Sequence, residues 1–319
     1  MEKFIYLDWN VIQYCKNPHE SEIYSEFLAL INDLKRKYKF PFTEGQLLDL
    51  SVSSNDGKID KNIQEDLNVL KNISDSWALG YNHIDEPQLV QIDDIDIEFY
   101  KILDKKNERI ATKMMPNFNP IKIDLSKINE NDLYYKFIYK NNGYLSSEVL
   151  DDILQHMTDV FDDTEKYKKI RNEFMNLRST IVHRENTFLD ESTILFNFII
   201  DYLSFIEIDN IQKLEEKFIG ILEQHFILIG KNYTCASLKE KIETGIMLLD
   251  FNRSFTEKIT KKNKLRNMTR DCKHICMASD AEYFITEDNS TYKKGKFIYK
   301  ILNVKTKINK MNEFCYNFL

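Results

Sequence analysis

The sequence lacks several features that would assign it to a large class of proteins. No apolar run reaches the roughly 18 residues that a membrane-spanning helix needs, and the N-terminus shows no signal-peptide pattern. Five cysteines in 319 residues are few and odd in number, which argues against a disulfide framework and predicts a reducing, cytoplasmic setting. The net charge of −7 argues against a general nucleic-acid coat protein, although it says nothing of a local basic surface.

Proline and glycine are also scarce, and no proline follows Pro120. The middle of the chain instead shows the apolar spacing of amphipathic helices. We therefore predict a mostly helical insertion over residues 79–234, entered through an acidic segment. The helices expected in it are Ser146–Phe161, Glu165–His183, Glu191–Phe205 and Ile211–Leu228.

The two ends of the chain alternate between strand and helix patterns, which is the order of a parallel α/β sheet. They predict a discontinuous core made of residues 1–78 and 235–319. The expected strands are Lys3–Leu7, Phe40–Thr43, Tyr283–Thr286 and Lys300–Lys305. The expected helices are Glu20–Lys37, one that begins with Gln46–Ser51, Asp271–Ser279 and Met311–Phe318.

Four acidic residues lie just past these strands or near the start of these helices: Asp8, Asp49, Asp271 and Asp288. Open α/β sheets gather their ligand groups at such positions. Carboxylates that converge repel one another, and a divalent cation relieves the repulsion. Oxygen ligands favour Mg²⁺ or Mn²⁺ over zinc, so the pattern predicts metal-assisted phosphodiester hydrolysis.

At these residues the chain resembles the PIN-domain ribonuclease family. The resemblance lies in Asp8-Trp-Asn10-Val, in Thr43 six residues before Asp49-Leu, in Asp271 seven residues before Ala278, and in Thr286-Glu-Asp288. It implies a PIN-like parallel sheet, with Asp8, Asp49, Asp271 and Asp288 as catalytic metal ligands for one or two Mg²⁺ or Mn²⁺ ions. Asn10 and Thr286 would orient the carboxylates or water.

Two departures from the family pattern stand out. The second acid is Asp rather than the commoner Glu, and the gap from Asp49 to Asp271 is long enough to hold the helical insertion. Glu44 is a rival second acid, but it falls at the expected strand end rather than one turn into the helix.

A basic segment precedes the third acid. Its members are Lys258, Lys261, Lys262, Lys264 and Arg266, and they would supply counter-charge for a phosphate backbone. The competing interpretation is a solvated face in a lysine-rich protein.

Other patterns carry weaker alternatives. Arg178 and His183 have the Arg-x4-His spacing of the metal-free helical HEPN ribonucleases, although an ordinary interhelical or surface pair is the simpler interpretation.

Cys272, His274 and Cys276 cannot close a tetrahedral zinc site from one helix, so we expect the cysteines in the core. Aromatic residues of the insertion would stack on unpaired bases or, more simply, pack in the core: Tyr134, Tyr135 and Tyr139.

The expected activity is therefore metal-dependent endonucleolytic cleavage of single-stranded RNA. By the same resemblance, such an enzyme would be a toxin or defence effector held in check by an inhibitory partner protein. A homo-oligomer is a separate expectation that no motif in the sequence specifies. The alternative is a non-catalytic protein that keeps a PIN-like core and binds a partner through its helical lobe.

Overall fold

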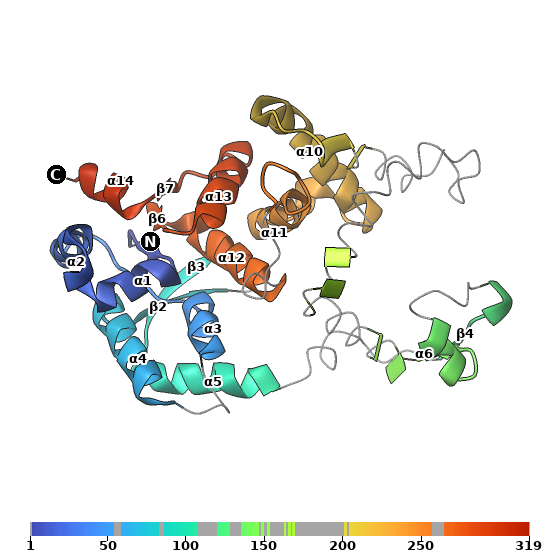
Figure 1. The fold of residues 1–319 in the computed structure, drawn as a ribbon, viewed down its shortest axis with the longest axis horizontal. Helices are drawn as coiled ribbons and strands as arrows, with labels where there is room; N and C mark the ends of the chain where they lie inside the picture. The colour runs from blue at the N-terminus through green and yellow to red at the C-terminus, as the bar shows by residue number, and fades with distance from the viewer. Residues whose placement is uncertain are drawn as a thin grey trace.

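The computed structural model describes residues 2–53, 59–82, 86–107, 120–127, 135–146, 201–202, 204–256 and 265–318, with single residues or pairs between 148 and 169. It is a mixed α/β structure with a small parallel sheet flanked by helices (Figure 1). In the part of the chain that it describes, no helix is both long and apolar enough to cross a lipid bilayer.

The elements follow one another in this order: β1 (Ile5–Leu7), α1 (Trp9–Lys16), α2 (Glu22–Leu34), α3 (Glu44–Val52), α4 (Lys61–Ser74), β2 (Trp77–Tyr81), β3 (Pro87–Gln91), α5 (Ile95–Asn107), β4 (Ile121–Lys122), α6 (Tyr135–Lys140), β5 (Tyr144–Leu145), α10 (Ile211–Leu228), α11 (Leu238–Leu249), α12 (Leu265–Met277), β6 (Tyr283–Ile285), α13 (Asn289–Ile301), β7 (Lys307–Asn309) and α14 (Met311–Tyr316).

The central sheet joins the two ends of the chain in the order β1–β6–β7, with both pairs parallel. Leu7 lies opposite Ile285, and the amide of Asp8 donates to the Ile285 carbonyl at 2.9 Å. Parallel strands end at the same edge of a sheet. The residues that follow β1 and β6 are therefore neighbours although about 280 positions separate them.

The sheet continues past β1 through isolated bridges rather than a regular strand. Phe4 bridges to Lys39, and Phe42 bridges to Ala78 in the antiparallel β2–β3 hairpin. The expected strand Phe40–Thr43 is thus reduced to these contacts, which still fix where α3 begins.

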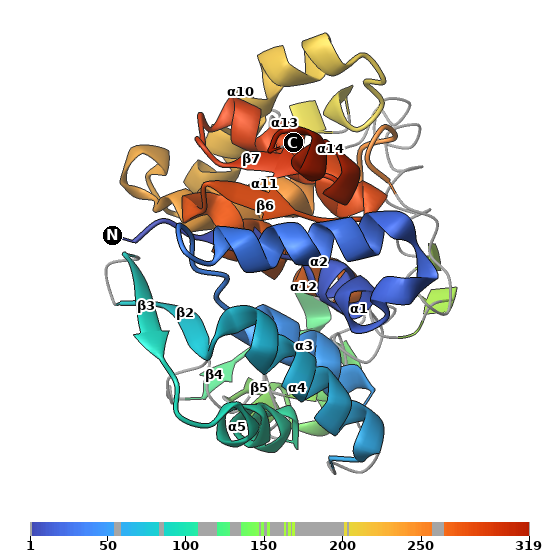
Figure 2. The same ribbon diagram turned by 90° about the vertical axis from the view of Figure 1, so that its left-hand side faces the viewer.

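Side chains that alternate along the short strands enter two separate cores, because the sheet is buried on both faces. Tyr6 and Phe284 pack with α10, α11, α12 and α13. Ile5, Leu7 and Ile285 pack with α1 to α5 and with α14. Figures 1 and 2 both show the N-terminal helices α3 to α5 on one side and the C-terminal helices α10, α11 and α13 on the other.

Two expected boundaries were wrong. The strand placed at Lys300–Lys305 is the end of α13 and a turn; the strand is Lys307–Asn309. Phe297, Ile298 and Ile301 continue the apolar face of the helix, which ends before Asn303 at φ 55°. The helix expected to open at Asp271 begins six residues earlier, at Leu265, so Asp271 lies in the middle of α12.

In the middle segment, α10 has the expected bounds, Ile211–Leu228. Most of the three preceding expected helices lies outside the described residues. The beginning of the segment also carries the β2–β3 hairpin and α5, whose buried residues, such as Phe99, join the core beside β1. The chain's five cysteines are all free, and Cys272 and Cys276 are buried as expected.

Candidate metal centre

Asp8 is held in place by the end of β1 and the start of α1. One carboxylate oxygen, Oδ1, accepts from the Trp9 amide at 2.7 Å and caps α1. The other, Oδ2, accepts from the Thr286 hydroxyl at 2.5 Å. Only 4% of Asp8 is exposed. An Asp that caps a surface helix would normally be solvated, so this burial singles Asp8 out.

Asp49 reaches the same place from α3. Thr43 caps this helix, and the Gln46 side chain donates to the Leu7 carbonyl at 2.8 Å, which ties the first turn of α3 to the end of β1. Asp49 lies about one turn after Gln46, on the same face of the helix. The capping interaction thus sets the direction from which Asp49 approaches Asp8.

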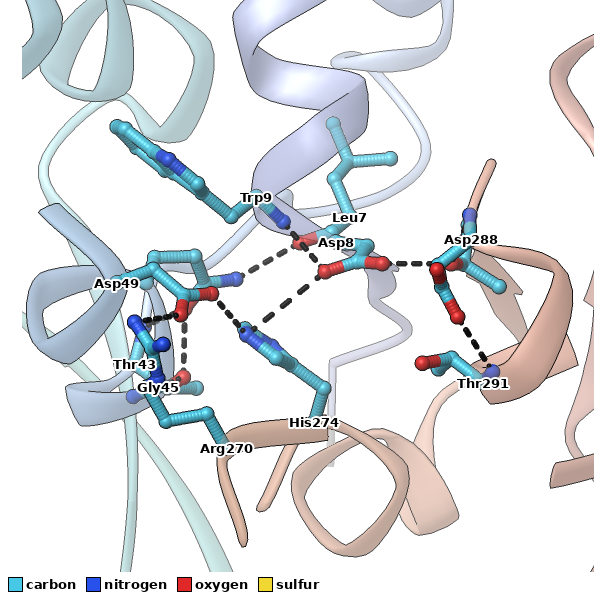
Figure 3. A network of polar contacts seen from close by, with 12 residues as sticks. Leu7, Asp8, Trp9, Thr43, Gly45, Asp49, Arg270, His274, Asp288 and Thr291 are labelled. Carbon is cyan, nitrogen blue, oxygen red and sulfur yellow. Dashed lines mark hydrogen bonds and ion pairs between the residues drawn. The ribbon is translucent and has the colours of Figure 1, made fainter. Parts of the chain in front are cut away.

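Two cations from α12 complete the cluster (Figure 3). His274 Nε2 lies 2.7 Å from Asp49 Oδ2 and 3.7 Å from Asp8 Oδ1. Arg270 contacts Asp49 Oδ1 at 3.0 Å. Since Arg270 and His274 are four residues apart, they project from the same face of the helix.

The hydrogen bonds show how His274 is protonated. Thr43 Oγ1 accepts from the Gly45 amide and donates to Gln46 Oε1, so the Tyr6 hydroxyl at 2.9 Å must donate to it. Tyr6 then accepts from His274 Nδ1 at 2.8 Å. Nε2 faces two carboxylates. Both ring nitrogens therefore carry protons, and His274 is an imidazolium.

The electrostatic surroundings agree with this assignment. Burial by itself would lower the pKa of His274, but the charges of Asp8, Asp49 and Asp271 and the hydrogen bond to Asp49 raise it to about 9. Burial raises the pKa of Asp8, and the charges of Asp49 and Asp288 add to that effect, while His274 and Thr286 oppose it.

Asp288 lies beside Asp8 at the end of β6. Its amide donates to Thr286 Oγ1 at 3.1 Å, and its Oδ1 accepts from the Thr291 amide at 2.7 Å to cap α13. Thr286 therefore links the backbone of Asp288 to the carboxylate of Asp8. Asp271 is half-buried on α12, and its charge reaches the centre through its effect on His274.

The remaining candidate residues lie apart from this cluster or outside the residues that the structure describes. Asn10 is exposed on α1, and Glu44 is exposed and 3.6 Å from Lys273, so neither joins the buried carboxylates. Tyr135 stacks on Tyr139. The described part of the chain does not include Lys258, Lys261, Lys262, Lys264, Tyr134, Arg178 and His183, or the side chain of Arg266.

Asp8, Asp49 and His274 offer three ligand atoms that lie within 4.8 Å of one another. Ligands about 2.1 Å from one ion lie at most about 4.2 Å apart, so a small inward movement brings the trio into range. The short contact between His274 and Asp49 must open at the same time, and Nε2 must lose its proton to become a ligand. With these three adjustments the residues fit a divalent cation.

Comparison of the chain with protein-family models, with curated proteins and with solved structures finds no match. The arguments below therefore rest on the geometry of this chain alone.

The sequence pattern did not identify His274 and Arg270 as part of the centre. The pattern that could have identified them is the i, i+4 spacing of Arg270 and His274, which places both side chains on one face of the helix. Asp271, three residues before His274, adjoins that face. The helix start expected at Asp271 hid this spacing, because it excluded Arg270.

Proposed function

We propose that the protein is a metal-dependent endonuclease that cleaves single-stranded RNA. The proposal rests on one observation: two carboxylates and an imidazole from three separate elements meet, largely buried, at the carboxyl edge of a parallel sheet. Asp288 adds a third carboxylate at this edge, next to Asp8. Buried carboxylates without a cation repel one another, and this is the arrangement that hydrolytic metal sites use.

Each residue has a separate task in this proposal. Asp8, Asp49 and, once deprotonated at Nε2, His274 hold the cation. Thr286 fixes the direction of the Asp8 carboxylate through its hydrogen bond. Tyr6 fixes the His274 ring through Nδ1. When bound, the cation lowers the pKa of water and stabilises charge on the leaving oxygen.

Of the two cations expected from carboxylates, Mn²⁺ suits this centre better than Mg²⁺. Mg²⁺ prefers oxygen ligands alone, whereas an imidazole nitrogen suits later divalent metals. The position of His274 between Asp8 and Asp49 therefore favours Mn²⁺.

The test is cleavage of a mixed single-stranded RNA with Mn²⁺, with Mg²⁺ and with EDTA. We expect cleavage with Mn²⁺, weaker cleavage with Mg²⁺ and none with EDTA. Asp8→Asn should abolish cleavage and leave the protein folded, since the amide keeps the shape of the side chain and removes the charge. Arg178→Ala/His183→Ala should cleave like the wild type; its inactivity would favour the metal-free helical mechanism instead.

The second candidate is a non-catalytic protein that binds a partner through its helical lobe, and one observation favours its lack of catalysis. Asp49 is already paired with Arg270 and His274, so the cluster is partly neutralised without a metal. If the wild type neither cleaves RNA nor gains thermal stability with Mn²⁺, this candidate replaces the nuclease.

A further inference from the structure

Thr291 has a buried hydroxyl with no hydrogen-bond partner. The residue lies in the first turn of α13 and is 1% exposed, and its Oγ1 contacts no donor or acceptor among the described residues. Threonine in a helix usually bonds its hydroxyl to a carbonyl one turn earlier. Buried hydroxyls in folded proteins nearly always have a partner, so this one requires an explanation.

The hydroxyl lies at the edge of the metal centre. The Thr291 amide donates to Asp288 Oδ1 at 2.7 Å, and the Asp288 amide is linked through Thr286 to Asp8. Figure 3 shows the Thr291 side chain extending from α13 beneath the Asp288 carboxylate, toward the side on which His274 lies.

The surrounding charges restrict what can meet this hydroxyl. Asp8 and Asp288 accept hydrogen bonds, so a group that can donate to them fits next to Thr291 better than a phosphate oxygen, which only accepts. A water molecule can donate to both carboxylates and accept the hydroxyl proton. Water is therefore the partner that satisfies all three groups.

We infer that Thr291 is a positioning residue whose hydroxyl donates to a water held between Asp8 and Asp288, the water consumed in hydrolysis. In that step the water oxygen bonds to phosphorus as the bond from phosphorus to the leaving oxygen breaks. One water proton passes to the Asp288 carboxylate that the water already bonds, and the leaving oxygen takes a proton from solvent. This inference rests on the proposed function. We expect this water to bind together with the cation; without it the Thr291 hydroxyl has no partner among the described residues.

The test compares Thr291→Val with Thr291→Ser and with Thr286→Val as the matched control. Thr291→Val keeps the side-chain shape and removes an unpaired hydroxyl, so its melting temperature should equal or exceed that of the wild type. Its kcat should fall at least about tenfold with KM nearly unchanged, because substrate binding does not use the hydroxyl. Thr291→Ser should restore kcat. Thr286→Val should lower both kcat and melting temperature, since it breaks the bond to Asp8.

A crystal structure of the Mn²⁺-loaded protein provides a readout that does not depend on turnover. We expect an ordered water within hydrogen-bond distance of Thr291 Oγ1 in the wild type and none there in Thr291→Val. The inference is overturned if the wild type cleaves RNA without such a water, if Thr291→Val keeps full kcat, or if it loses as much stability as Thr286→Val. If the Mn²⁺-loaded wild type does not cleave RNA, the proposed function is wrong. The catalytic role of the water is then wrong as well, whether or not a water is bound to Thr291 Oγ1.

Discussion

His274 is a buried cation among carboxylates, and it performs in the metal-free protein part of the task that a metal would perform. It is 1% exposed and in contact with Asp49, and Asp8 lies 3.7 Å from it. Without a positive charge here, Asp8 and Asp49 would repel each other in a medium that screens poorly. The imidazolium therefore stabilises the folded state without a cation, and a proton and the proposed cation would compete for the same centre.

This role predicts how stability depends on pH. The pKa of His274 is about 9 in the folded protein and near 6.5 in an unfolded chain, so folding takes up a proton between these values. The stabilisation is complete below about pH 6.5 and is lost as pH rises through about 9. Its size is about 3 kcal/mol. The raised pKa of Asp8 acts in the same direction, because ionising this buried carboxyl also costs folding free energy.

The measurement is the free energy of unfolding in urea, in EDTA, at several pH values from 6 to 9. His274→Gln is the control, because the amide still donates to Asp49 but does not titrate. The difference between wild type and variant should shrink as pH rises. A constant difference would show that His274 is neutral in the folded protein.

At the residue scale, the sequence indicates which carboxylates follow a strand, because strand ends can be predicted from apolar runs such as Phe4–Leu7 and Tyr283–Ile285. It does not indicate His274. A histidine between two buried cysteines on one helix fits a core position equally well, and only the packing of α12 against α3 brings it to Asp49. The place of His274 in the site thus depends on a tertiary contact that cannot be predicted from the local sequence.

At the scale of elements, the C-terminal half is organised by close packing of α10, α11 and α13. Gly245, in the interior of α11, allows this approach. A Cβ atom there would lie 2.8 Å from Ile298 Cδ1 and 3.0 Å from Phe218 Cζ, and both of these residues are fully buried. Glycine in a helix interior is unfavourable by itself, so its presence reflects the packing.

We expect Gly245→Ala to destabilise the protein by about 1–3 kcal/mol, since overpacking exceeds the gain in helix propensity. Gly220→Ala is the matched control. Gly220 lies in the interior of α10, and a Cβ atom there would meet nothing within 4 Å. That variant should be more stable by up to about 1 kcal/mol. Thermal unfolding of the two variants measures the contrast, and a stabilised Gly245→Ala would show that α10 and α13 move apart easily.

The elements also show where pattern reading succeeds and where it fails. The bounds of α10 could be predicted because its buried residues Leu214, Phe218, Ile221 and Leu222 keep a helical period over its length. The run from Lys300 to Lys305 could not, because a short apolar run fits either a strand or the end of a helix. The positive φ of Asn303 and the pairing of β7 with β6 decide between them, and both depend on tertiary structure.

At the scale of the whole molecule, a net charge of −7 must be reconciled with the proposed RNA substrate. A local basic surface would resolve this, because association depends on the field near the site more than on the total charge. The basic run ends where α12 begins, and Arg270 and His274 on α12 reach the carboxylate centre. The sequence thus places positive charge a few residues before the helix that completes the site.

We therefore expect Lys258→Ala/Lys261→Ala/Lys262→Ala to weaken RNA binding and to flatten its salt dependence. Each lysine that neutralises a phosphate releases counterions, so removing three should reduce the log–log salt slope by up to about 2. Turnover of bound RNA should change much less, since the carboxylates remain. The charge-matched control replaces three exposed lysines of α4 and α10, Lys61, Lys213 and Lys217. The measurement is RNA affinity from low to high salt for the two triple variants. Equal salt slopes would mean that only total charge matters. A loss of affinity confined to the variant of the basic run would identify that run as the path by which RNA reaches the centre.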